Sequence, residues 1–264
     1  MYDFTYHRAA SVDQAKKLLA AAADGRYLAG GMTLLPTMKQ RLANPSDLID
    51  LAGIAELAGI RRDGKALVVG AMTTHAAVAA SAEARTAIPA LAALAGMIGD
   101  PQVRNRGTIG GSLANSDPAA DYPAAVLALG ATVRTDRREI AGDDFFTGMF
   151  ETALDNGELI TAVSFPVPEA ACYMKFANPA SRYAIVGVMV ARTGAGVRVA
   201  VTGAGPCAFR VAAMEKALAK TFAPEAIAGI GVPADDLNAD IHAGADYRAH
   251  LIGVMAKRAV AGCA

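Results

Sequence analysis

The chain has 264 residues, of which 53% are hydrophobic, so it can bury one large core or two ordinary ones. Its 25 basic and 25 acidic residues give a formal net charge of zero, which excludes the basic footprint of a nucleic-acid-binding protein. Its apolar runs are shorter than the roughly 20 residues that span a bilayer, and its first residues lack the apolar core of a signal peptide. We therefore expect a cytoplasmic protein with no membrane span and no nucleic-acid partner.

The cysteines and histidines show no metal-ligand spacing. Cys172, Cys207 and Cys263 lie far apart and form no C-x-x-C pair, which argues against a zinc site or an iron–sulfur cluster. We expect three separate, reduced thiols and no metal in this chain.

The first part of the chain predicts helices alternating with short apolar strands. Residues 11–23 are typical of a helix that Ser11 caps and Gly25 stops. Short strands are expected at residues 26–28 and 47–51, with a helix between them that carries Pro36 in its first turn. This order indicates a small βαβ-type unit that ends near Leu57.

The middle of the chain predicts further strands and alanine-rich helices. We expect strands at residues 66–70, 131–135 and 157–166 and helices at residues 74–80 and 88–98.

A proline pair, Pro166 and Pro168, then marks a domain boundary. Beyond it the pattern predicts a hairpin around residues 193–196, followed by helices at residues 208–220 and 246–262.

Two glycine-rich stretches interrupt this pattern: "LAGGMTLLPTMKQR" at residues 28–41 and "TIGGSLANSDPAADYPAAV" at residues 108–126. Glycine lets the backbone take positive φ and lets a ligand approach without meeting a Cβ. A helix that begins just after the first pair would add free N–H groups for a phosphate. Each glycine pair alone is more often a structural turn. Neither matches G-x-G-x-x-G or the P-loop, which disfavours a Rossmann nicotinamide site and a nucleoside triphosphatase.

Polar residues follow the second glycine pair closely: Ser112, Asn115, Ser116, Asp117 and Asp121. Their hydroxyl, amide and carboxylate groups suit a ribityl or ribose chain. The alternative is that they form turns and caps, with Asp117–Pro118 opening the helix that follows.

Together the two stretches resemble the FAD-binding medium subunits of the molybdenum hydroxylases, and most closely the carbon monoxide dehydrogenase medium-subunit group. The resemblance continues through "DDFFTGMFETAL", "GELITAVSFPVP", "MKFANPASRYAIVGVMVA" and "DIHAGADYRAHLIGVMAKRA", and so covers nearly the whole chain in order. It implies an α+β fold. A PCMH-type FAD-binding domain, related to vanillyl-alcohol oxidase, would span residues 1–168 with subdomains at about 1–57 and 58–168. A smaller C-terminal domain of sheet and helices would span residues 169–264.

The resemblance also implies that both glycine stretches wrap the FAD pyrophosphate. Asp121 would hydrogen-bond the cofactor, Leu159 would lie near the flavin, and Lys175 would reach the isoalloxazine and stabilise negative charge on it. Without the resemblance, Lys175 would be interpreted as a solvated charge on a strand. Tyr183 either flanks the flavin or is a core aromatic. With Asn115 from the polar run, the expected cofactor contacts are Ala29, Gly30, Gly31, Met32, Thr33, Leu34, Leu35, Thr108, Ile109, Gly110, Gly111, Ser112, Asn115, Asp121, Leu159, Lys175 and Tyr183.

The function implied is that of a flavoprotein oxidoreductase subunit for electron transfer, with no catalytic residue of its own. Its partners would be an iron–sulfur small subunit and a molybdenum-cofactor large subunit, in a heterotrimer that dimerises. Electrons would pass from [2Fe–2S] clusters through FAD to an external acceptor, and the substrate would be selected in another subunit. A self-contained FAD-dependent oxidoreductase of the same fold and a non-catalytic nucleotide-binding assembly protein remain open as alternatives.

Overall fold

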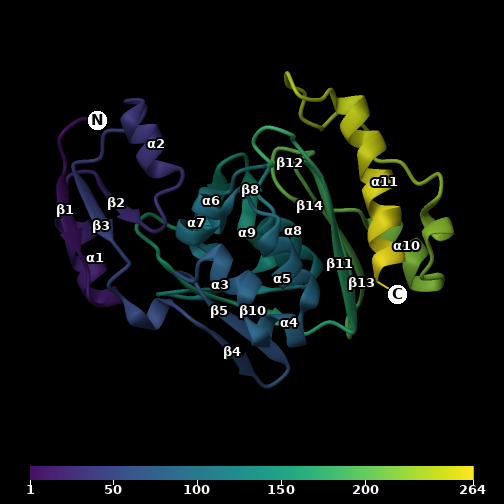
Figure 1. The fold of residues 1–264 in the computed structure, drawn as a ribbon, viewed down its shortest axis with the longest axis horizontal. Helices are drawn as coiled ribbons and strands as arrows, with labels where there is room; N and C mark the ends of the chain where they lie inside the picture. Colours follow the sequence, from purple (N-terminus) through teal and green to yellow (C-terminus); the bar gives the residue numbers. More distant parts are fainter. Residues whose placement is uncertain (264) are drawn as a thin grey trace.

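A computed structural model describes residues 1–263, which form three parts that follow one another along the chain (Figure 1). We name them the N-terminal unit (residues 1–57), the middle unit (58–168) and the C-terminal unit (169–263). Figure 1 shows the purple sheet of the N-terminal unit and the yellow helix α11 at opposite ends, with the middle unit between them. No helix among these residues is long and apolar enough to cross a membrane.

The N-terminal unit is a three-stranded parallel sheet in the order β1-β3-β2, which confirms the predicted βαβ-type arrangement. The Ser11 hydroxyl caps α1 by accepting from the Gln14 N–H at 3.2 Å. Its elements are β1 (Thr5–Arg8), α1 (Val12–Ala21), β2 (Gly25–Leu28), α2 (Leu34–Lys39), β3 (Asp47–Asp50) and the 3-10 turn η1 (Ala55–Leu57).

The prediction that Gly25 stops α1 is wrong. The helix ends at Ala21 because Ala22 is extended, and Gly25 begins β2 instead. Glycine is needed there for close packing, since a Cβ at residue 25 would lie 2.9 Å from the Ala22 Cβ.

The middle unit is built on a five-stranded antiparallel sheet in the order β4-β5-β10-β6-β7. Helices α5 and α8 are rich in alanine and leucine and lie in the core of the unit, and every residue of α8 is buried. Its elements are β4 (Ile60–Asp63), β5 (Ala66–Gly70), α3 (His75–Ala80), α4 (Ala82–Ala87), α5 (Pro89–Gly96), α6 (Pro101–Arg106), α7 (Ile109–Asn115), α8 (Tyr122–Ala128), β6 (Thr132–Thr135), β7 (Glu139–Ala141), α9 (Gly142–Phe145), β8 (Phe146–Gly148), β9 (Glu151–Thr152) and β10 (Ile160–Pro166).

Two expectations about the second glycine stretch are corrected here. Its glycines lie inside the short helix α7, because Thr108 caps that helix by accepting from the Gly111 N–H at 3.1 Å. Asp117 does not open α8, which begins at Tyr122. The Asp117 carboxylate instead accepts from the Ala119 N–H at 2.8 Å and closes a turn.

The C-terminal unit is a four-stranded antiparallel sheet in the order β11-β12-β13-β14, and its strand β12 is buried on both faces. One face of the sheet packs on the middle unit and the other on α10 and α11. Its elements are β11 (Ala170–Ala177), β12 (Ala184–Thr193), β13 (Gly196–Thr202), β14 (Phe209–Arg210), α10 (Ala212–Lys220), the 3-10 turn η2 (Pro224–Ile227) and α11 (Ala245–Gly262).

The three cysteines are free, but they are not all separate as expected. The Cys263 Sγ donates to the Val190 carbonyl at 3.6 Å, and Val190 is the register partner of Cys172 across β11 and β12. Helix α11 therefore brings Cys263 to Cys172.

One buried arginine fixes α11 to the sheet. Arg248 is 3% exposed, and its guanidinium donates to the carbonyls of Ile185 at 2.7 Å and Gly203 at 2.9 Å. It also pairs with the Asp240 carboxylate at 2.7 Å. The helix thus satisfies two backbone acceptors that the sheet leaves open.

We expect Arg248→Met to lower the free energy of unfolding by about 2 to 3 kcal/mol, because two buried carbonyls and a carboxylate lose their donor. Arg258→Met, on the exposed face of the same helix, should change it by less than about 0.5 kcal/mol. Urea unfolding followed by circular dichroism measures both values. Equal losses in the two variants would contradict this role for Arg248.

Candidate functional site

A cavity of about 550 Å³ lies between the N-terminal and middle units. The loop after β2, the region from α6 to α7 and the segment that leads into β10 supply most of its lining. The C-terminal unit adds residues 181–183. This volume is typical of sites for cofactors and other small molecules, so all three units face one ligand-sized space.

The loop between β2 and α2 (residues 29–33), which we call the first glycine loop, presents free backbone N–H donors to this cavity. The Leu35 N–H donates to the Gly31 carbonyl, but the N–H groups of residues 30–34 have no acceptor within the described chain. Gly31 has a φ of 71°, the left-handed conformation that glycine favours and that occurs in anion-binding backbone nests. The loop can therefore bind an anion such as a phosphate through several N–H groups at once.

The second glycine pair differs, because its N–H groups are already bonded within the chain. It offers the cavity a wall of small residues, together with the side chains of Ser112 and Asn115. Ile109 N–H donates to Thr73 O at 3.1 Å, and Gly110 N–H donates to Ala71 O at 2.8 Å. The next two N–H groups both donate to Thr108: Gly111 to its Oγ1 at 3.1 Å and Ser112 to its carbonyl at 3.0 Å.

The glycines of both loops allow parts of the chain to approach each other. A Cβ at Gly30 would lie 2.1 Å from the Arg106 carbonyl oxygen, and a Cβ at Gly110 would lie 2.6 Å from the Ala71 Cβ. A Cβ at Gly111 would lie 3.3 Å from the Ala29 Cβ of the first loop. The absence of a Cβ therefore lets the first loop lie against α6 and α7, and only the first loop also exposes donors.

Asp121 and Lys175 are bonded to each other. Asp121 lines the cavity with a 5% exposed side chain, and its carboxylate accepts from Tyr173 at 2.5 Å and from Lys175 Nζ at 3.0 Å. Burial raises the pKa of Asp121, and both partners oppose that rise. Lys175 also donates to the Met97 carbonyl at 3.2 Å and its side chain is 3% exposed, so the alternative of a solvated strand charge is wrong.

Fourteen of the seventeen residues predicted to contact the cofactor line the cavity, and Leu35, Ile109 and Lys175 do not. Leu159 is 5% exposed within the wall. Tyr183 is 48% exposed and lines the cavity, so it is not a core aromatic. Their contacts with a cofactor stay predictions.

His75 is a lining residue that sequence reasoning missed. It is 5% exposed, its Nδ1 has no partner within the described chain, and its ring lies 5.4 Å from that of Tyr122. Burial, and then the nearby Arg104 charge, lower the pKa of His75 to about 4, so the imidazole is neutral at pH 7. The available signal in the sequence was its position directly after Thr74, the N-cap of α3; the bridge from Thr74 to Thr108 appears only in the structure.

Comparison with known proteins decides the family. Residues 2–168 match the family described as the FAD binding domain in molybdopterin dehydrogenase. The chain is 37% identical to the carbon monoxide dehydrogenase medium chain of Hydrogenophaga pseudoflava, over 97% of this chain and 96% of that one. The chain belongs to the FAD-binding medium subunits of the molybdenum hydroxylases.

Two further matches extend over the whole medium subunit. The nicotine 6-hydroxylase medium subunit of Paenarthrobacter nicotinovorans is 36% identical over 97% of this chain and 95% of its own length. A solved structure of carbon monoxide dehydrogenase from Hydrogenophaga pseudoflava, which lacks the Mo-pyranopterin moiety, superposes with a TM-score of 0.91 and 36% identity. It covers 99% of this chain and 97% of that chain.

These matches confirm the predicted α+β fold with a PCMH-type FAD-binding domain, and the class of flavoprotein oxidoreductase subunit. The cofactor of the medium subunit is FAD. The cavity suits this group chemically: free N–H groups in residues 30–34 fit a diphosphate, Ser112 and Asn115 fit a polyol, and Leu159 fits a ring.

We expect Gly31→Ala to weaken FAD binding about fivefold to thirtyfold, because an L residue disfavours the left-handed φ by about 1–2 kcal/mol and the loop would reorient its N–H groups. Gly64→Ala is the matched control, since Gly64 has a φ of 58° in the β4–β5 turn with nothing near a Cβ. Fluorescence titration with FAD gives both affinities. An unchanged affinity in a folded Gly31→Ala variant would remove this loop from the site.

His75 should make stability depend on pH. The unfolded chain binds more protons than the native chain between pH 6.5 and 4, so the free energy of unfolding falls by about 3 kcal/mol as the pH falls through this window. His75→Gln should remove that part of the dependence, whereas His242→Gln, at an exposed position, should keep it. Urea unfolding at several pH values tests this, and parallel curves for wild type and His75→Gln would contradict a buried neutral His75.

Proposed function

We propose that this medium subunit receives electrons from [2Fe–2S] clusters of a small partner subunit through its FAD and passes them to an external acceptor. A large subunit with the molybdenum cofactor would hydroxylate the substrate. The observation that carries this proposal is the end-to-end similarity to medium chains of a carbon monoxide dehydrogenase and a nicotine 6-hydroxylase. Since such different substrates go with similar medium chains, substrate choice belongs to another subunit.

The cysteine content supports the same division of roles. The chain has three cysteines, whereas a [2Fe–2S] cluster takes four thiolate ligands. The clusters would therefore be held by the partner. The resemblance to the family implies a heterotrimer that dimerises.

Within the medium subunit, residues 30–34 would hold the diphosphate through their N–H groups, and Ser112 and Asn115 would bind the sugar chain. Leu159 would pack against the flavin ring system, and the exposed Tyr183 would lie at the rim where an acceptor or partner approaches. FAD supplies the one- and two-electron chemistry, and the protein supplies position and electrostatics.

The domain division follows from the same proposal. Residues 1–57 and 58–168 would be the two subdomains of the FAD-binding domain, because the cavity lies between them and the family match ends at residue 168. Residues 169–264 would form the separate C-terminal domain.

Mixing the FAD-loaded chain with a chemically reduced iron–sulfur partner subunit tests the proposal. We expect the flavin absorption to bleach at a rate that saturates with partner concentration, because transfer requires a bound complex. The isolated FAD-loaded chain should stay oxidised when carbon monoxide or an aromatic heterocycle is added.

Two results would contradict electron transfer from a partner. Substrate-driven bleaching of the isolated chain would favour a self-contained flavoenzyme. A bound flavin that no reduced partner bleaches would favour a non-catalytic nucleotide-binding assembly protein.

A further inference from the structure

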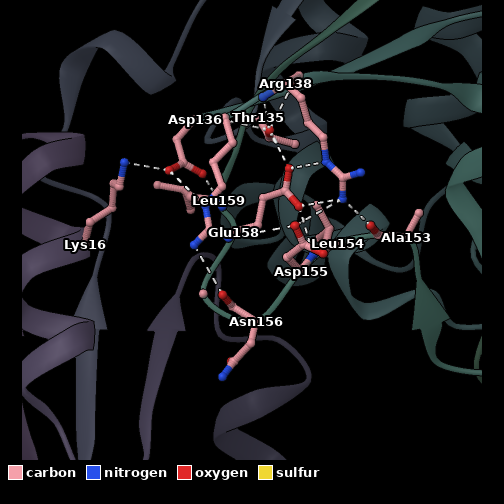
Figure 2. Close-up of polar contacts among 12 residues, drawn as sticks. Lys16, Thr135, Asp136, Arg138, Ala153, Leu154, Asp155, Asn156, Glu158 and Leu159 are labelled. Atoms are coloured by element: carbon pink, nitrogen blue, oxygen red, sulfur yellow. Dashed lines mark hydrogen bonds and ion pairs between the residues drawn. The ribbon is translucent and has the colours of Figure 1, made fainter.

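The segment between β9 and β10 forms one wall of the cavity. Its residues Leu154, Glu158 and Leu159 all line that space, although none belongs to either glycine loop. The segment has no regular structure of its own, and side-chain bonds add to the backbone hydrogen bonds that fix its position (Figure 2).

Glu158 attaches this segment to the turn between β6 and β7. Its side chain is 0% exposed and accepts from Thr135 at 2.7 Å, from Arg138 at 3.1 and 2.9 Å, and from the Asp155 N–H at 2.8 Å. The Arg138 guanidinium lowers the pKa of Glu158 to about 2, so the carboxylate is ionised at neutral pH. With both oxygens bonded inside the wall, Glu158 is suited to positioning the segment.

Asp136, in the same turn, forms two hydrogen bonds with the backbone of Leu159. The Asp136 N–H donates to the Leu159 carbonyl at 2.9 Å, and the Asp136 carboxylate accepts from the Leu159 N–H at 2.8 Å. These bonds tie the Leu159 backbone to the turn, while the Leu159 side chain packs in the hydrophobic core of the N-terminal unit.

The same carboxylate reaches across to the N-terminal unit. Its second oxygen lies 2.8 Å from Lys16 Nζ, and Lys16 lies on α1. Figure 2 shows Lys16 extending from the N-terminal unit toward Asp136, with Leu159 beside the same carboxylate. The Asp136 side chain is 2% exposed and the Lys16 side chain 38%, so water screens this ion pair from one side only.

A second hydrogen bond joins the N-terminal and middle units near the same position. The Tyr27 hydroxyl donates to the Gly157 carbonyl at 3.3 Å, and Tyr27 lies on β2, just before the first glycine loop. Moving the two units apart would break this bond and the Lys16–Asp136 pair together.

We propose that Lys16, Asp136 and the backbone of Leu159 form a positioning bridge that closes the N-terminal unit over the cavity and fixes Leu159 against the bound flavin. This inference rests on the placement of FAD in this cavity. Breaking the ion pair would speed FAD release, whereas removing the acceptor for the Leu159 N–H would also change the environment of the flavin.

Three variants separate these two roles. Lys16→Met removes the crossing charge alone, and Asp136→Asn removes the pair with Lys16, together with the weaker pair with Arg137 at 3.8 Å, but keeps an oxygen for the Leu159 N–H. Both should release FAD about threefold to fivefold faster, with an unchanged flavin spectrum and reduction potential. Asp136→Ala should release FAD faster still and also shift the spectrum and the potential. Lys17→Met, the exposed neighbour on α1, is the control and should behave as wild type.

Salt provides an independent readout, because it screens the exposed side of the ion pair. FAD release from the wild-type chain should accelerate as ionic strength rises, and release from Lys16→Met should depend on salt less. Rates are measured from the fluorescence of FAD freed after dilution, and potentials by redox titration.

The proposal is overturned if Lys16→Met releases FAD at the wild-type rate, or if Asp136→Ala leaves the flavin spectrum and potential unchanged. Should Gly31→Ala weaken FAD binding while the bridge variants behave as wild type, the cavity would stand as the FAD site without the bridge. If neither set affected FAD, the placement of the cofactor would itself be wrong.

Discussion

The close approach of Gly30 to the backbone of Arg106 is the contact on which the site depends. Any side chain at residue 30 would put a carbon 2.1 Å from the Arg106 carbonyl oxygen, so the loop from the N-terminal unit would have to withdraw from the middle unit. Gly110 imposes a similar condition where α7 lies against Ala71 at the end of β5. Gly30 thus sets the spacing of the two units, and that spacing defines the cavity, whereas Gly110 sets the position of α7 within the middle unit.

Helix capping and burial together explain why the two glycine stretches differ as hydrogen-bond donors. Gly110 is buried and donates to Ala71, whereas Gly111 and Ser112 are partly buried and donate to Thr108, which caps α7. The first loop is partly open to solvent, and its N–H groups remain available to a ligand. Two acidic groups in the wall, Asp121 and Glu158, are neutralised by Lys175 and Arg138, which reduces their repulsion of an anionic cofactor.

Local sequence predicted much of this arrangement, because strand and helix periods, the Ser11 cap and the glycine pairs act over a few residues. The helix around Gly110 was missed, because glycines suggest a loop and only the bonds to Ala71 and Thr73 reveal otherwise. The burial of Lys175 depends on a partner 54 positions away, and no local pattern encodes that distance. The contact between Lys16 and Asp136 likewise exists only once the two units meet.

The most direct test of the division between free and bonded backbone N–H donors is amide NMR of the chain labelled with 15N-glycine and 15N-methionine. Spectra are recorded before and after FAD is added. We predict that the N–H resonances of Gly30, Gly31 and Met32 move downfield as they gain a phosphate acceptor, while those of Gly110 and Gly111 move less because their bonds are already made. The resonance of Gly64, which does not line the cavity, should not move. Large shifts at Gly110 and Gly111 with none at residues 30–32 would contradict a diphosphate held by the first loop.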